Sequence, residues 1–95
     1  MKILGHEYKI EFNEHLSQEA GANGQCCSNR LKIILDPTLP ESRTEEALLH
    51  EIFEALKFHL NLLDLSHETL SQLAECLYQV FVDNPHCFNI TVLNP

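Results

Sequence analysis

A histidine and two glutamates stand close together in the segment "ALLHEIFEALKF", residues 47–58. His50, Glu51 and Glu54 give the pattern H-E-x-x-E, which differs at one position from H-E-x-x-H, a helical motif whose two histidines bind zinc. Residues four apart on a helix lie on one face, with β-carbons about 5–6 Å apart. Imidazole nitrogen and carboxylate oxygen are both zinc ligands. His50 and Glu54 can therefore bind the same cation.

Glu51 has a different place in this pattern. It lies about 100° around the helix from His50, because an α-helix has about 3.6 residues per turn. At that offset the Glu51 carboxylate is better placed to reach a metal-bound water than to bind the metal itself. We therefore expect Glu51 to act as the general base.

A catalytic zinc site needs a third protein ligand, because such sites use three protein ligands and a water. The second helix of the chain is the expected source. His67 is the first candidate, because it lies in the first turn of that helix and neutral histidine is a common zinc ligand. Glu75 is the second candidate, and Glu68 and Gln72 are weaker ones.

The same helix face has a simpler interpretation as a solvated, acidic surface. Glu46, His50, Glu54 and Lys57 lie on one side, and charged side chains at this spacing are common on exposed helices. The chain would then be a protein-interaction module with an acidic helix face and no chemistry. A di-metal carboxylate site is excluded for one chain, because it needs four helices. The other histidines are interpreted as surface or helix-end residues, namely His6, His15, His59 and His86.

The first part of the chain has the patterns of strands. Residues 2–13, "KILGHEYKIEFN", alternate in part and predict a bent strand or a tight hairpin around Gly5. Residues 18–29 contain two glycines and two asparagines and are expected to form a loop. Residues 30–37, "RLKIILDP", predict a second strand that prolines terminate.

Two helices follow. Ser42 and Glu45 have the spacing of a capping box, and the first helix is expected to end within "HLNLLDLS", residues 59–66. Ser66 is the expected N-cap of a second helix that runs to about Asp83. Because the connection is short, the helices should pack as an antiparallel hairpin. The apolar residues expected in the core are Leu49, Ile52, Phe53, Leu56 and Leu60 in the first helix, and Leu70, Leu73, Leu77 and Phe81 in the second.

The order of these elements predicts an α+β fold. A small N-terminal β-hairpin or sheet comes first, followed by an antiparallel two-helix hairpin. The C-terminal residues 87–95, "CFNITVLNP", are compatible with a short strand. With 95 residues, the chain is expected to form one domain, residues 1–95.

Charge and composition narrow the class of partners. The formal net charge is −8, with only 6 basic residues, which disfavours nucleic acids and anionic membranes and is compatible with cations. The sequence has no apolar run of membrane-spanning length and no signal-peptide pattern, so a cytoplasmic location is expected. The four cysteines form no C-x-x-C pair and are expected to be free thiols.

Two segments resemble a known group of proteins. "LLHEIFEAL", residues 48–56, and "LSHETLSQLAECLYQVFVDNP", residues 65–85, are similar to motifs of small bacteriophage and mobile-element proteins described as minimal zincin-like metallopeptidases. The match extends from Leu31 to Pro85.

This resemblance implies a role for each residue of the pattern. His50 matches the first metal-binding histidine, Glu51 matches the general base, and Glu54 falls where H-E-x-x-H members have their second histidine. His67 matches a histidine before the second helix, which keeps a set of two histidines and one glutamate. The implied function is a zinc-binding, metallopeptidase-like protein that acts on a peptide or protein, and Tyr78 is a conceivable oxyanion stabiliser.

Overall fold

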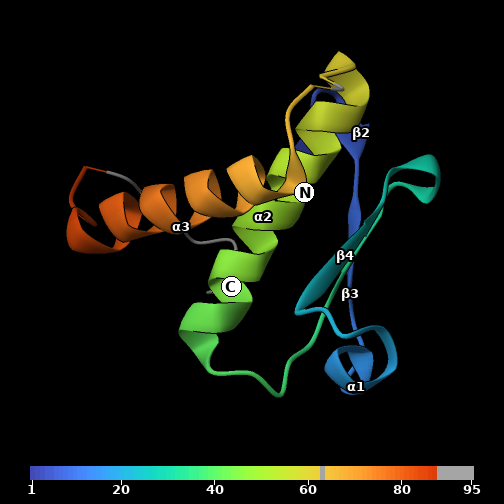
Figure 1. Ribbon diagram of the computed structural model, residues 1–95, viewed down its shortest axis with the longest axis horizontal. Coiled ribbons are helices and arrows are strands. Elements are labelled where there is room, and N and C mark those ends of the chain that lie inside the picture. The colour runs from blue at the N-terminus through green and yellow to red at the C-terminus, as the bar shows by residue number, and fades with distance from the viewer. Residues whose placement is uncertain (63, 88–95) are drawn as a thin grey trace.

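The computed structural model describes residues 1–62 and 64–87, in which two small sheets precede two long helices (Figure 1). This arrangement confirms the predicted α+β fold. In chain order the elements are β1 (Lys2–Ile3), β2 (His6–Glu7), β3 (Lys9–Phe12), α1 (Leu16–Ala20), β4 (Gly24–Cys27), η1 (Ser28–Arg30), β5 (Lys32–Leu35), α2 (Glu41–Leu60) and α3 (His67–Asp83).

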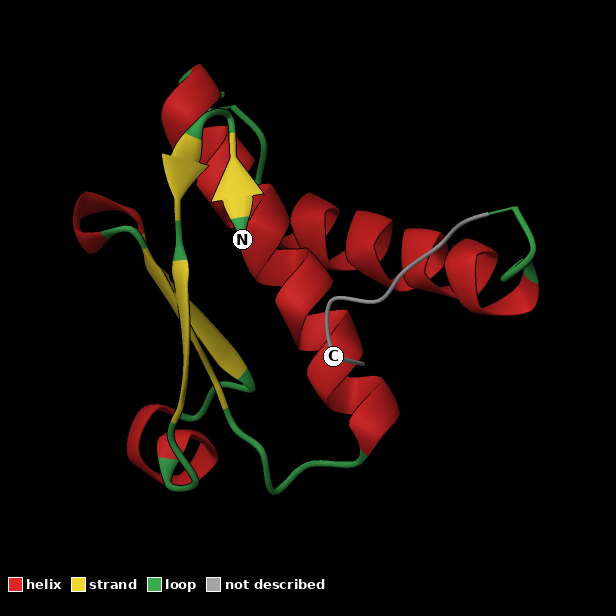
Figure 2. Ribbon diagram, turned by 180° about the vertical axis from the view of Figure 1, so that it is seen from behind, coloured by secondary structure: helices red, strands yellow, loops and turns green. Residues whose placement is uncertain are grey.

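The N-terminal strands form the expected hairpin and then enter a second sheet. β1 and β2 pair antiparallel around Gly5, whose φ of 82° is a conformation that glycine adopts without steric cost. The second sheet has the order β3-β5-β4, in which β3 is parallel to β5 and β4 is antiparallel to β5. β5 is thus the central strand of this sheet, and both of the strands that pair with it precede it in the chain; Figure 2 shows the strands in yellow.

The prediction of a loop at residues 18–29 is wrong. The segment contains the end of α1 and all of β4, with η1 beginning at Ser28. β4 has the sequence "GQCC" and pairs with β5 through contacts such as Cys26 with Ile33. Its strand conformation comes from this pairing, which the glycines and asparagines of the sequence do not reveal.

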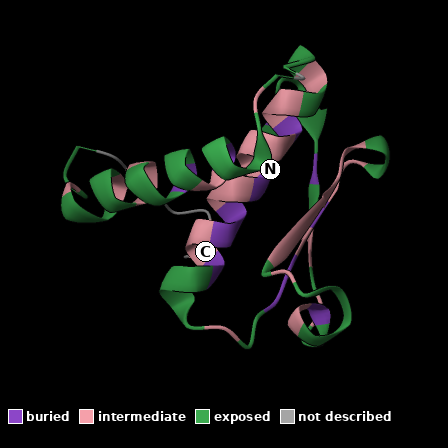
Figure 3. Ribbon diagram, viewed as in Figure 1, coloured by how far each residue is buried: buried purple, intermediate pink, exposed green. Residues whose placement is uncertain are grey.

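The core lies between the three-stranded sheet and α2. Ile33 and Leu35 of β5 have no exposed surface, and Tyr8 is 1% exposed. On α2, Ala47 and Ala55 are buried against this core, and their small side chains let the helix approach the sheet closely. Figure 3 shows the buried part of α2 on the side of the sheet, while the far half of α3 is mostly exposed.

The predicted start of α2 is also wrong. Ser42 and Glu45 do not form a capping box, because the helix already begins at Glu41 and Ser42 lies inside its first turn. Pro40 occupies the position before the helix, and no side chain caps the first amides. The end of the helix agrees with the sequence, since Asn61 adopts the left-handed conformation (φ 55°) that commonly terminates helices.

The predicted apolar stripes are only partly correct. Leu70 is buried and Ile52 and Leu56 pack partly against the core, but Leu60 is 53% exposed and Leu73 is 49% exposed. The buried residues of α2 are Thr44, Ala47, Leu48, Glu51 and Ala55. α2 lies between the sheet and α3 (Figure 1), so it has two covered sides and no single apolar face.

The second helix begins as predicted, with Ser66 as N-cap. The Ser66 hydroxyl oxygen accepts a hydrogen bond from the Thr69 amide at 3.1 Å. α3 runs antiparallel to α2, because its start lies beside His50 and Tyr78 lies beside Glu45. It therefore begins next to the middle of α2 and extends away from the sheet (Figures 1 and 2). The expected C-terminal strand lies outside the described residues, except for Cys87.

Candidate metal centre

The helices bring the three predicted metal ligands together. His50 and Glu54 come from adjacent turns of α2, and His67 comes from the first turn of α3. One potential ligand atom from each residue lies within 4.8 Å of the other two. The rings of His50 and His67 meet edge to face, with centroids 4.7 Å apart. Of the described residues, these three form the cluster that could hold a metal ion.

His67 reaches this place because the connection between the helices is short and both of its ends are fixed. The left-handed Asn61 ends α2, and its amide donates to carbonyls of the last turn. The cap of Ser66 then starts α3 at the residue before His67. The first side chain of α3 therefore lies beside the middle of α2, where the His67 ring meets that of His50.

His50 is held in a form that suits metal binding. Burial lowers the pKa of His50, and the neighbouring His67 lowers it further, while Glu54 opposes the change. The neutral imidazole, which is the metal-binding form, is therefore favoured. The Ser71 hydroxyl lies 3.4 Å from Nδ1 of His50, a contact that orients the ring and leaves Nε2 available.

Glu54 supplies the observation that distinguishes a metal site from a solvated face. Its Oε1 atom is buried and has no hydrogen-bond partner in the described part of the chain. A buried polar atom without a partner costs free energy, about 1–3 kcal/mol and more for a charged group. A cation that this oxygen and the two histidines bind together would satisfy it, and the three side chains are close enough to share one ion, so the residues present fit a bound metal ion.

Glu51 lies beside the triad and outside it. The residue is 7% exposed and packs against the backbone of β4, where a Cβ on Gly24 would stand 3.2 Å from its Oε2. Burial raises the pKa of Glu51 from 4.5 to about 7, and the charge of Glu54 contributes to the increase. A carboxylate with such a pKa can accept and release a proton near neutral pH.

A cavity of about 290 Å³ opens onto this group. Its lining includes His50, Glu51 and His67, together with Gly24 at the start of β4 and residues 21–23, which precede that strand. Glu75, the alternative third ligand, also lines the cavity, but it is not among the atoms that gather within 4.8 Å. Of the two candidates, His67 therefore has the geometry of a ligand.

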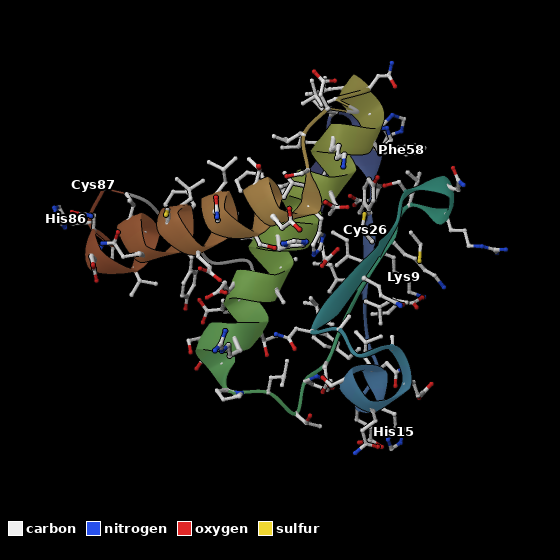
Figure 4. The ribbon with its side chains drawn as sticks, in the orientation of Figure 1. Lys9, His15, Cys26, Phe58, His86 and Cys87 are labelled. Atoms are coloured by element: carbon white, nitrogen blue, oxygen red, sulfur yellow. The ribbon has the colours of Figure 1, made fainter. Side chains whose placement is uncertain are left out.

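The other histidines are placed differently. His15 lies near α1 and His86 lies beyond the end of α3, both far from the middle of α2 (Figure 4). His59 has a role that the sequence did not indicate, because its Nε2 lies 2.6 Å from the buried Tyr8 hydroxyl and its ring stacks on His6 at 4.4 Å. Tyr78 contacts Glu45 at 3.4 Å and is absent from the described lining of the cavity.

The sequence did not identify the residues that β4 contributes. Gly24 allows the close approach of Glu51, and Cys26 borders a second cavity with Glu54 and Phe58. No local pattern could have revealed them, because their position depends on the pairing of β4 with β5. Ser71 was also missed, although it lies one turn after His67 and on the same face of α3.

No family model, no curated protein and no solved structure matches this chain. The resemblance to zincin-like proteins therefore stays a prediction that rests on the two sequence motifs. Within residues 1–62 and 64–87, no helix is both long and apolar enough to cross a membrane.

Proposed function

We propose that His50, Glu54 and His67 bind one divalent ion of the zinc class, and that the protein is a metallopeptidase-like hydrolase. The observation that carries this proposal is the convergence of the three side chains within 4.8 Å, together with the unpartnered, buried oxygen of Glu54. A solvated acidic face would instead leave that oxygen in water. The interaction-module alternative is therefore less well supported.

The donor set favours zinc over the alkaline-earth ions. Two imidazoles and one carboxylate are typical ligands of zinc, whereas Mg²⁺ and Ca²⁺ prefer sets made of oxygen. The lowered pKa of His50 keeps its imidazole neutral, so a metal ion does not have to compete with a tightly held proton. Three protein ligands are also the number found in catalytic zinc sites.

The zinc ion, Glu51 and the cavity would each have a separate role in hydrolysis. A bound zinc ion would polarise a carbonyl group and lower the pKa of water. Glu51, which is buried beside the triad, would take a proton from the attacking water. The cavity beside β4 would admit the substrate, and the resemblance to zincin-like proteins favours a peptide or protein as that substrate.

Metal titration tests the proposed site. Untagged protein is freed of metal with a chelator, the chelator is removed, and zinc is added in a calorimeter. We expect one zinc ion per chain, and a large loss of affinity in His50→Ala, Glu54→Ala and His67→Ala. His15→Ala and His86→Ala are the matched controls, because both residues are exposed and remote from the site. Equal affinity in wild type and His67→Ala would overturn the ligand set.

A further inference from the structure

The cavity beside the candidate metal site has a second group of charged residues. His50 and His67 line this cavity, and so do Glu46 and Glu75. Glu46 precedes His50 by about one helical turn, which places it about 6 Å further along the axis of α2. Because α3 runs antiparallel to α2, Glu75 lies on the same side of the two histidines as Glu46. Glu46 and Glu75 thus form an acidic end of the cavity.

The negative charge of this acidic end is only weakly compensated. Among the described residues that line the cavity, Arg43 alone is an arginine or lysine, and its Nη1 lies 3.9 Å from Oε1 of Glu46. This contact is long and the Arg43 side chain is 62% exposed, so water weakens the ion pair. Glu75 is exposed and has no hydrogen bond or ion pair among the described residues. The acidic end therefore keeps carboxylate oxygens that can bind a further cation.

A buried carboxylate in the same cavity points independently to a bound ligand. Glu51 is 7% exposed, and it has no hydrogen bond or ion pair within the part of the chain that the structure describes. Its Oε2 faces Gly24, which also lines the cavity. A buried acceptor without a donor costs free energy. The amide groups of a bound peptide, or a water held beside the metal, would supply that donor.

We propose that the cavity selects peptides with a lysine or arginine side chain, and that Glu46 and Glu75 bind this cation. The inference rests on the proposed function for the place of the scissile bond, whose carbonyl would lie at the metal. The separation of about 6 Å along α2 corresponds to about two residues of an extended peptide, at about 3.3 Å per residue. The basic side chain therefore belongs within about two residues of the scissile bond. The net charge of −8 also favours the approach of basic peptides.

The same residues disfavour an acidic substrate. Its carboxylate could pair with Arg43, but Glu46 already lies beside that guanidinium and Glu75 lines the same cavity. Two carboxylates and one guanidinium leave this end of the cavity with a net negative charge, which repels a further carboxylate. Arg43 instead competes with a basic substrate for Glu46.

Peptide binding tests this inference without requiring hydrolysis. Three dye-labelled peptides of alanine and glycine, with blocked ends, differ only in a central lysine, glutamine or glutamate. Fluorescence anisotropy measures their affinity for zinc-loaded Glu51→Gln, which lacks the general base, and for metal-free wild type. At low salt we expect the zinc-loaded protein to bind the lysine peptide about 2–30-fold more tightly than the glutamine peptide. The glutamate peptide should bind most weakly.

Substitutions in the Glu51→Gln background separate the acidic end from the general charge of the protein. Glu46→Gln and Glu75→Gln should each lower the preference for lysine by about 2–5-fold. Arg43→Gln should raise this preference, because it frees Glu46. Glu68→Gln is the matched control, since Glu68 is also an exposed glutamate of α3 but is absent from the described lining of the cavity.

The possible results distinguish this inference from the proposed function. Equal affinity of the zinc-loaded protein for the lysine and glutamine peptides, a preference for glutamate, or no binding of any peptide would overturn the inference and leave the metal site intact. An equal loss of preference in Glu68→Gln and Glu75→Gln would identify general charge attraction and would also overturn it. Failure to bind zinc would overturn the proposed function, and the metal-free measurement would still show whether the cavity selects lysine.

Discussion

The buried carboxylate of Glu51 should make the stability of the metal-free protein depend on pH. In the unfolded chain Glu51 ionises near pH 4.5, whereas in the folded protein burial raises its pKa to about 7. Below pH 4.5 the group is protonated in both states and has no effect. Between pH 4.5 and pH 7, Glu51 loses its proton in the unfolded chain but keeps it in the folded protein, so the folded state becomes less stable as the pH rises. Above pH 7 the full penalty applies.

Glu51→Gln removes the charge and keeps the shape, so it should abolish this penalty. The difference between pKa values of 4.5 and about 7 corresponds to about 3 kcal/mol at 1.36 kcal/mol for each pKa unit. Above pH 7 the variant should therefore be more stable than wild type by up to about 3 kcal/mol, and this advantage should vanish below pH 4.5. Urea denaturation in the presence of a chelator measures both differences.

The exposed Glu19 offers a matched control for this experiment. Glu19→Gln should change the free energy of unfolding little, because water solvates the Glu19 carboxylate in the folded and unfolded states alike. The reasoning is refuted if Glu51→Gln differs from wild type by the same amount above pH 7 and below pH 4.5. That result would mean that Glu51 ionises normally in the folded protein.

Further predictions concern the surroundings of the site and its chemistry. Gly24→Ala should lower the free energy of unfolding by about 1–3 kcal/mol, since the new methyl group would stand 3.1 Å from Cγ of Glu51. The cost should shrink in a Glu51→Ala background, and equal costs in a denaturant double-mutant cycle would exclude this clash. Asp36 accepts hydrogen bonds from Ser17 and Thr38, which hold its pKa below the usual range. Wild-type stability should therefore fall as the pH drops below 3.8, and Asp36→Asn should show a lower Tm at neutral pH and a shallower acid dependence in thermal melts. Glu51→Gln should keep its zinc affinity by calorimetry and lose any hydrolytic activity, whereas loss of zinc would identify Glu51 as a ligand.

The local parts of the site could be predicted from the sequence. His50 and Glu54 are one helical turn apart, so their convergence follows from helix geometry alone. The cap at Ser66 fixes the start of α3, and a short connection between two helices requires His67 to return to the side of α2. Both predictions depend only on residues that lie close together in the sequence.

The contributions of tertiary packing could not be predicted in this way. β4 is a strand because it pairs with β5, and this pairing alone brings Gly24 and Cys26 against α2. The unpartnered oxygen of Glu54 likewise results from packing between elements that the motif does not specify. The predicted apolar stripe of α2 is only partly correct for a related reason, because the helix is covered on two sides and the prediction assumed one apolar face.

The most direct test of the metal site is a crystal structure of the untagged protein with zinc, using anomalous scattering at the zinc absorption edge. The proposed ligand set predicts one peak per chain, about 2.0–2.2 Å from a nitrogen of His50, an oxygen of Glu54 and a nitrogen of His67. A zinc peak held by other residues, or no peak at this position in protein saturated with zinc, would contradict the assignment.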